Sequence, residues 1–197
     1  MKLTQQSRRN VVVTAMLAAV AFILMLLEFS VPIMPGFIKM DFSELPALIA
    51  AYALGPWWGA LVCLLKNLLH LTITATAGAG ELANCALGVA LVVPAGYIYK
   101  IKKCKGFALL GAAVGAAFMA LISFPINYFF TYPIYSWIIP MDQIIAAYRK
   151  IMPAVDSIGK ALLIFNVPFT FVKGLITAAI TFVIYKPLSP LIKGKIK

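Results

Sequence analysis

A chain of 197 residues that is 63% hydrophobic and 12% charged is too apolar for a soluble globular domain and too long for a single membrane anchor. Its net charge of +11 does not indicate nucleic-acid binding, because the basic residues cluster by position and are not interleaved with stacking aromatic residues. We therefore predict an all-α integral membrane protein, a single domain over residues 1–197 that contacts the lipid bilayer and no nucleic acid.

Apolar runs predict six transmembrane helices packed in one bundle. In chain order, the expected helices are residues 10–29, 44–54, 56–76, 80–99, 107–132 and 162–185. The second is too short to cross a bilayer at full thickness, which is tolerated where a helix is surrounded by protein or lines a cavity. Within the fifth, Gly111 and Gly115 have the spacing of a close helix-packing motif.

The distribution of charge predicts the orientation of this bundle. Lysine and arginine gather in a short arm at residues 1–9, in the segment that follows the fourth helix, and in a tail at residues 186–197. The acidic residues all fall in or beside the segments expected on the other side: Glu28, Asp41, Glu44, Glu81, Asp142 and Asp156. Because basic residues are enriched on the cytoplasmic side, we expect both termini in the cytoplasm.

The loop at residues 31–44, VPIMPGFIKMDFSE, is unusually apolar for a segment outside the membrane. Folding back over the mouth of the bundle would bury its large side chains and cap a pocket. The loop is therefore interpreted as a lid, with an amphipathic segment resting on the bilayer as the alternative.

Few residues are suited to catalysis or metal binding. His70 is the only histidine, so we expect no metal site and interpret His70 as a packed or cavity-facing polar residue. Asp41 and Glu44 form the only carboxylate pair that a lipid-modifying enzyme could use. The segment AVDSIGKA at residues 154–161 lacks the Ser or Thr that follows the lysine of a phosphate loop. We predict that the protein is not an enzyme.

Polar residues inside the apolar runs indicate a binding site within the bundle. Lys173 lies mid-run, where a cation costs about 3 kcal/mol and is normally kept for recognition. Asn166 and Thr170 precede it at helical spacing on one face, and Asn127 interrupts the fifth helix. Amides and an ammonium group suit a neutral ligand rich in carbonyl, imide and hydroxyl groups. Hydrogen bonding between helices is the alternative reading.

Five segments also resemble a known family. They are KMDFSELPALIAAYALGPWWGALV, LLKNLLH, GELANCALG, INYFFTYPIYSW and VPFTFVKG. Their order and spacing are similar to those of the riboflavin-specific substrate-binding component, the S component, of energy-coupling factor (ECF) vitamin transporters. The resemblance extends over residues 16–187, and the motifs KMDFSELP, NYFFTYPIY and PFTFVKG are jointly specific.

The resemblance implies a plasma-membrane protein that captures riboflavin from outside and cannot transport it alone. In that family the S component docks on a transmembrane coupling subunit, the T component, which carries two cytosolic ATPases. The docking surface of the family includes an A-x-x-x-A pattern on the first helix, matched here by Ala15 and Ala19. Riboflavin is then the substrate, and no cofactor is expected.

The resemblance also places the ligand site between the first outer loop and helices four to six. The matching positions are Met40, Asp41, Phe42, Asn84, Asn127 and Lys173. The family usually has an asparagine where this chain has Thr170, and Asn166, one turn earlier, is a candidate to replace that amide. Another vitamin, a flavin analogue, and a small secondary transporter remain the alternatives. A phosphorylated flavin fits less well, since one deep cation would face about two negative charges.

Overall fold

The computed structural model describes residues 4–74 and 76–192, with side chains to residue 185. It is mainly helical, as expected. Four helical stretches are long and apolar enough to cross a membrane: α1 (Gln5–Leu26), α4 (Ala79–Ile101), Lys105–Tyr135 and Ile158–Tyr185. α1 begins earlier than predicted because the side chain of Thr4 caps it by accepting a hydrogen bond from the Ser7 amide. The ends of the predicted arm and tail, residues 1–3 and 193–197, lie outside the described residues.

Two shorter helices form a hairpin between α1 and α4. α2 (Glu44–Ala53) is joined to α3 (Pro56–His70) through Gly55, whose φ of +124° favours glycine. α2 packs against α1, α3, α4 and α9, and nearly all of its residues are buried. This enclosure explains how so short an apolar helix is accommodated.

The third predicted helix was too long. α3 ends at His70 and is followed by a 3-10 turn, η1 (Leu71–Ile73), whereas we expected helix to residue 76. The hydroxyl of Thr74 accepts hydrogen bonds from the amides of Thr76 and Gly78, and these bonds stabilise a turn in place of a further helical turn.

The other two long stretches are each interrupted by a π-helical segment. α5 (Lys105–Ile126) continues through η2 (Asn127–Thr131) into α6 (Tyr132–Tyr135). α8 (Ile158–Ala161) continues through η3 (Leu162–Asn166) into α9 (Val167–Ile192). Both stretches extend beyond the predicted limits 107–132 and 162–185. Such π-helical turns occur frequently at functional sites.

Two elements were not predicted, so the all-α description is too simple. β1 (Phe29–Ser30) pairs antiparallel with β2 (Lys39–Met40), and together they tie down the loop interpreted as a lid. α7 (Met141–Ile151) is an amphipathic helix between α6 and α8. Strands of two residues carry no periodicity that a sequence could reveal.

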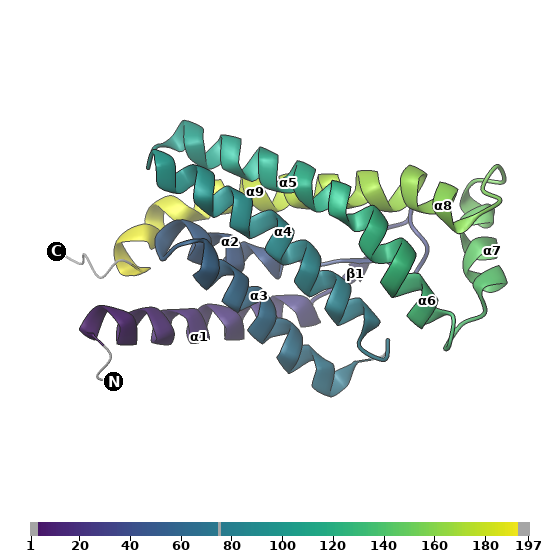
Figure 1. Cartoon of the computed structure of the whole chain (residues 1–197), viewed down its shortest axis with the longest axis horizontal. Coiled ribbons are helices and arrows are strands. Elements are labelled where there is room, and N and C mark those ends of the chain that lie inside the picture. Colours follow the sequence, from purple (N-terminus) through teal and green to yellow (C-terminus); the bar gives the residue numbers. More distant parts are fainter. Residues whose placement is uncertain (1–3, 75, 193–197) are drawn as a thin grey trace.

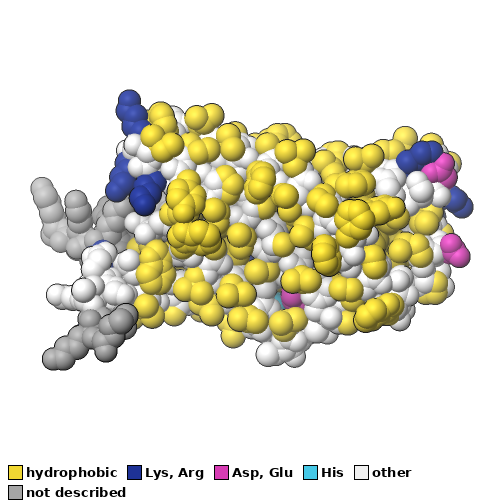
Figure 2. All heavy atoms as spheres, in the orientation of Figure 1, with side chains coloured by type: hydrophobic (Ala, Val, Ile, Leu, Met, Phe, Trp, Pro, Cys, Tyr) yellow, Lys and Arg dark blue, Asp and Glu magenta, His cyan; other side chains and the backbone are white. Residues whose placement is uncertain are grey.

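Figure 1 shows how the elements are arranged. The start of α1, the end of α9 and the α4–α5 turn lie at one end of the molecule, whereas α6, α7 and α8 lie at the other. In Figure 2 a broad hydrophobic flank separates two ends that carry charged side chains. This distribution is that of a protein surrounded by lipid along its sides.

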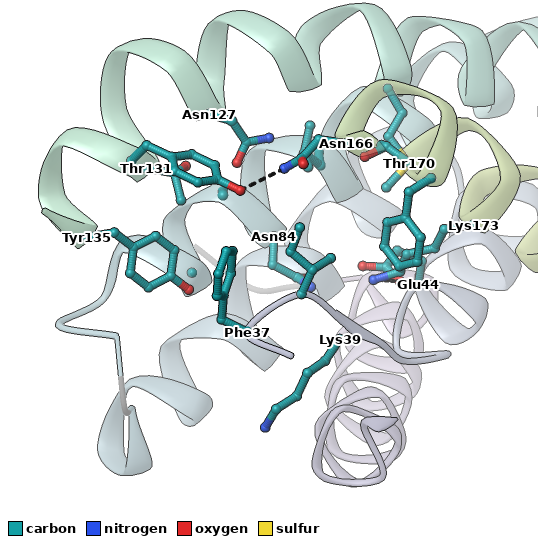
Figure 3. Close-up of a pocket in the computed structure, with 17 residues that line it drawn as sticks. Phe37, Lys39, Glu44, Asn84, Asn127, Thr131, Tyr135, Asn166, Thr170 and Lys173 are labelled. Atoms are coloured by element: carbon teal, nitrogen blue, oxygen red, sulfur yellow. Dashed lines mark hydrogen bonds and ion pairs between the residues drawn. The ribbon is translucent and has the colours of Figure 1, made fainter. Parts of the chain in front are cut away.

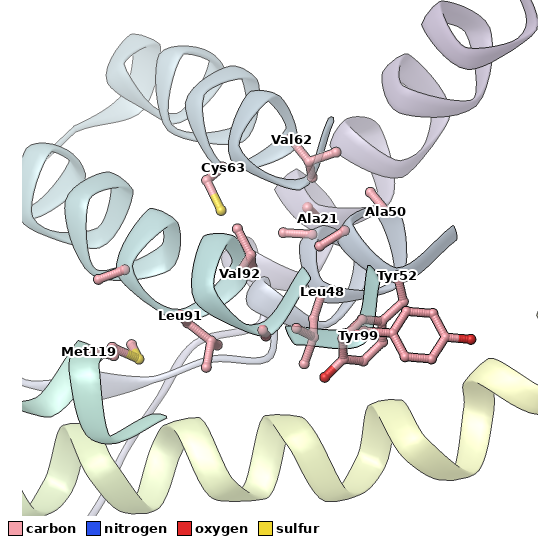
Figure 4. Packing of buried hydrophobic residues seen from close by; sticks show 14 of the residues in the cluster. Ala21, Leu48, Ala50, Tyr52, Val62, Cys63, Leu91, Val92, Tyr99 and Met119 are labelled. Carbon is pink, nitrogen blue, oxygen red and sulfur yellow. The ribbon is translucent and has the colours of Figure 1, made fainter. Parts of the chain in front are cut away.

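We call the larger group of buried apolar residues the small-residue core (Figure 4). It lies among α1 to α5 and is rich in alanine. α4 and α5 approach so closely that a Cβ added at Gly111 would lie 2.7 Å from the carbonyl oxygen of Ala95, and one at Gly115 would clash with the carbonyl of Leu91. The predicted packing role of the two glycines is thus confirmed.

Candidate functional site

Two adjoining cavities lie towards the end of the molecule that carries α6 and α7, and Figure 3 shows the first of them. The first, of about 150 Å³, is bounded by the loop at 37–39 and by side chains from α4, η2, η3 and α9. The second, of about 350 Å³, lies between the same loop and the ends of α1 and α3. Together they fall within the range of small-molecule pockets, about 300–1,000 Å³.

Five of the predicted site residues line the first cavity: Asn84, Asn127, Asn166, Thr170 and Lys173. They come from three separate helical stretches, so the polar groups that the sequence placed inside the bundle converge on one space. Asp41 lines the second cavity, which also reaches Lys173. Met40 and Phe42 are absent from both linings within the described residues: Met40 is buried in β2, and the Phe42 ring lies 6.0 Å from that of Phe29.

The loop expected to be a lid does cover the cavities. Phe37 lines both of them, and its ring lies edge-on to Tyr132 at 6.4 Å and to Tyr148 at 5.9 Å between centroids. Its neighbour Ile38 packs against the same group of buried residues, which includes Tyr132 and Tyr148. The loop is therefore folded onto the bundle.

Four buried charged side chains form what we call the ionic cluster: Asp41, Glu44, Lys66 and Lys173. The Lys173 ammonium lies 2.8 Å from Oδ2 of Asp41 and 3.3 Å from Oε2 of Glu44. Lys66 lies 3.0 Å from the other oxygen of Glu44, Oε1, and also donates to the Ser43 hydroxyl. Two cations and two anions make the cluster neutral, which limits the cost of burying it.

The Asp41 carboxylate is held ionised by this arrangement. Burial alone would raise the pKa of Asp41, but the positive charges of Lys173 and Lys66 outweigh that effect and hold the pKa well below its usual range. One carboxylate oxygen of Asp41 accepts a hydrogen bond of 2.8 Å from the Ser43 amide, which fixes the carboxylate at the entry to α2.

A second polar group surrounds Asn166 at the junction of η3 and α9. Its Oδ1 accepts a hydrogen bond of 2.6 Å from the Tyr148 hydroxyl, and its Nδ2 donates to the Tyr132 hydroxyl at 3.1 Å. The two tyrosine hydroxyls are also hydrogen-bonded to each other. These bonds fix the orientation of the amide and leave its second N–H group for a ligand.

The other two amides are held in a similar way. Asn127 donates to the carbonyl of Ser123 at 2.7 Å, and Asn84 accepts from Nδ2 of Asn67 at 3.3 Å. In Asn127 the NH2 group, and in Asn84 the carbonyl oxygen, is engaged by the protein. The other polar group of each amide remains for a ligand. The cavity therefore presents several preoriented donors and acceptors among apolar and aromatic side chains.

His70 lines the second cavity, in agreement with its interpretation as a packed or cavity-facing polar residue. Its Nδ1 lies 2.8 Å from Oε1 of Glu81, and the Thr76 hydroxyl donates to the other oxygen of Glu81 at 2.8 Å. Over residues 4–74 and 76–192, no three His, Cys, Asp or Glu side chains come together as a metal site would require.

A comparison with protein families identifies the family of this chain. The model of the substrate-specific component of ECF transporters matches residues 9–185. The chain belongs to this family. An ECF S component is a multi-pass plasma-membrane protein and not an enzyme, so the lipid-modifying enzyme and the small secondary transporter are discarded as alternatives.

Individual relatives of this S component match over nearly their whole length. The riboflavin transporter RibU of Staphylococcus aureus (strain TCH60) is 29% identical over 98% of this chain and 96% of its own length. The riboflavin transporter FmnP of Bacillus subtilis (strain 168) is 32% identical over 94% of each chain. A solved S component of a bacterial ECF transporter superposes with a TM-score of 0.75 at 27% identity, covering 96% of this chain and 99% of its own.

Sequence reasoning missed several residues of the site. Lys66 was not among the predicted site residues, although a second lysine inside an apolar helix carries the same signal as Lys173. Tyr148 was missed because α7 was missed, yet Met141, Ile144, Tyr148 and Ile151 recur at helical spacing. Phe37 had no signal beyond its place in an apolar loop.

Proposed function

We propose that this S component captures riboflavin with high affinity from the outer side of the plasma membrane. Full-length similarity to two riboflavin transporters supports the ligand. The observation that carries the proposal is the convergence of Asn84, Asn127, Asn166 and Lys173 on one cavity with aromatic walls. Riboflavin combines a planar apolar ring system with carbonyl, imide and hydroxyl groups, and this lining complements both parts.

In this proposal each part of the site has a distinct task. Phe37, Tyr135 and Phe169 flank the isoalloxazine ring, while the three asparagines and Lys173 bond ring carbonyls or ribityl hydroxyls. Asn166 supplies the amide that Thr170 lacks. In the loop, Asp41 orients Lys173, and Met40 and Phe42 keep the loop closed through their packing beside β1.

The ionic cluster also favours riboflavin over its phosphorylated form. A phosphate near Lys173 would lie beside the carboxylates of Asp41 and Glu44, whose charges already balance those of the two lysines. Negative charges that lie side by side in a buried site repel each other strongly. The Thr170 departure leaves a flavin analogue as the second candidate ligand.

We infer that the whole chain, residues 1–197, crosses the membrane six times with both termini in the cytoplasm. The crossings are α1, α2, α3 with η1, α4, α5 to α6, and α8 to α9. The inference is supported by the lysine-rich turn between α4 and α5, which lies at the same end of the molecule as the start of α1 and the end of α9.

Transport by this S component requires a T component and two cytosolic ATPases. Ala15 and Ala19 are exposed on α1, whereas Ala18 and Ala21 on the same helix are buried in the small-residue core. α1 thus offers an exposed small-residue face on which another helix can pack closely, and we assign T-component docking to it.

The proposal is tested by titrating ligand-free protein in detergent with riboflavin and with its phosphorylated form, following flavin fluorescence. We expect stoichiometric quenching, tighter for riboflavin, and uptake into vesicles only when the T component and ATPases are present. Quenching by neither flavin would overturn the riboflavin assignment and leave the family unchanged.

A further inference from the structure

Lys66 is a fully buried cation that the binding site does not touch. It projects from α3 with an exposed fraction of 0% and, within the described part of the chain, lines neither cavity. Its ammonium contacts Oε1 of Glu44 at 3.0 Å and donates to the Ser43 hydroxyl. Both partners lie at the start of α2, so Lys66 acts on the ligand site indirectly, through these two contacts and through its charge.

Glu44 is shared between two lysines. Its Oε1 faces Lys66 and its Oε2 lies 3.3 Å from Lys173, while the shorter contact of Lys173, 2.8 Å, is with Asp41. An ammonium has three N–H groups. Asp41 accepts a hydrogen bond from one N–H group of Lys173, whereas Oε2 of Glu44 lies at ion-pair distance and accepts no hydrogen bond within the described residues. The Lys173 ammonium therefore keeps N–H groups for a ligand in the cavity that Lys173 lines.

We propose that Lys66 is a positioning residue of the ligand site, which neutralises Glu44 so that the Lys173 ammonium stays free to bond a ligand carbonyl. Without Lys66, Glu44 would be a buried carboxylate with Lys173 as its one remaining partner among the contacts described above. A buried uncompensated charge is costly, so Glu44 would draw Lys173 closer and away from the cavity. This inference rests on the proposed riboflavin function.

A simpler role for Lys66 would be to hold the start of α2 in place. The two roles differ in their dependence on Glu44. If Lys66 works by neutralising Glu44, its removal should matter only while Glu44 is charged. If it works by fixing the backbone around Ser43, or through the total charge of the cluster, that dependence on Glu44 alone disappears.

The experiment is a double-mutant comparison of riboflavin dissociation constants, measured by flavin quenching on purified ligand-free protein. Lys66→Met is introduced into the natural chain, into Glu44→Gln and into Asp41→Asn, and each is compared with its own background. The two double variants, Lys66→Met with Glu44→Gln and Lys66→Met with Asp41→Asn, each have a neutral cluster. They differ only in which carboxylate is removed, so they form a matched pair.

We expect Lys66→Met to weaken riboflavin binding about tenfold in the natural chain and in Asp41→Asn, and less than threefold in Glu44→Gln. Equal losses in the Glu44→Gln and Asp41→Asn backgrounds, or no loss in Asp41→Asn, would overturn the proposal. If Lys66→Met alone does not fold, the two neutral double variants still decide the question. Failure of the natural chain to bind riboflavin would instead refute the proposed function.

Discussion

The small-residue core and the polar site, which consists of the ionic cluster and the hydrogen-bonded group around Asn166, are neighbouring regions that are built by different means. In the core, α4 and α5 approach through Gly111 and Gly115, and the packing depends on the absence of side-chain atoms. In the polar site, the ionic cluster and the Asn166 group depend on bonds between particular atoms of separate elements. Shape therefore holds the core together, whereas the site requires each buried polar group to find its partner.

Two neighbouring residues of α9 show how close the two regions are. The Lys173 ammonium belongs to the ionic cluster, while a Cβ added at Gly174 would lie 2.9 Å from the Cβ of Ala116 on α5. Close packing of α9 on α5 thereby fixes the helix that carries Lys173. The polar site is positioned by the core, although the two can be perturbed separately.

The largest expected effect comes from breaking the ionic cluster. Lys173→Met leaves Asp41 as a buried carboxylate without its nearest cation, and we expect a loss of about 3–5 kcal/mol in the free energy of unfolding. Riboflavin binding should weaken at least about tenfold. Reversible unfolding in detergent and flavin quenching measure the two effects.

Lys160→Met is the matched control for this change. Lys160 pairs with Asp156, but its side chain is 54% exposed, so its removal should change neither quantity measurably. Similar small losses from both variants would show that the buried pair contributes no more than an exposed one.

A change in the core should affect stability and spare the ligand affinity. Gly115→Val places side-chain atoms against the carbonyl of Leu91, and we expect a destabilisation of about 1–3 kcal/mol from overpacking. The dissociation constant of the folded protein for riboflavin should be unchanged. Gly106→Ala is the control, because an added Cβ there meets nothing within 4 Å. A large loss of affinity in Gly115→Val would show that the two regions are not separable.

Within the site, variants of Asn166 and Thr170 test which of the two side chains bonds the ligand. Asn166→Ala should weaken riboflavin binding about tenfold, or about 1.4 kcal/mol, because it removes the amide assigned to the ligand. Thr170→Ala should have a smaller effect. The assignment fails if Asn166→Ala leaves the affinity unchanged while Thr170→Ala weakens it tenfold.

The smallest effect concerns the group that orients Asn166. Tyr148→Phe removes the hydroxyl that donates to Oδ1 of Asn166, and we expect a loss of about 1 kcal/mol in stability and weaker riboflavin binding. Tyr97→Phe, which removes a hydroxyl bonded to Trp57 at the surface, is the control for both measurements. Equal behaviour of the two variants would argue against a role for α7 in the site.

The sequence predicted local patterns well and long-range partners poorly. The spacing of Asn166, Thr170 and Lys173 fixes a shared helical face, so their convergence inside the bundle could be predicted. The pairing of Lys173 with Asp41 joins residues 132 positions apart, and no periodicity encodes it. The pairing of Lys66 with Glu44 could not be predicted for the same reason, since only the folded structure brings the two side chains together.

The most direct test of the account is the structure of this protein with riboflavin bound. We predict the isoalloxazine ring in the cavity between Phe37, α4 and α9, with the Lys173 ammonium about 3 Å from a ligand oxygen. Riboflavin located outside this cavity, or Lys173 bonded to Asp41 and Glu44 with no contact to the ligand, would contradict the account.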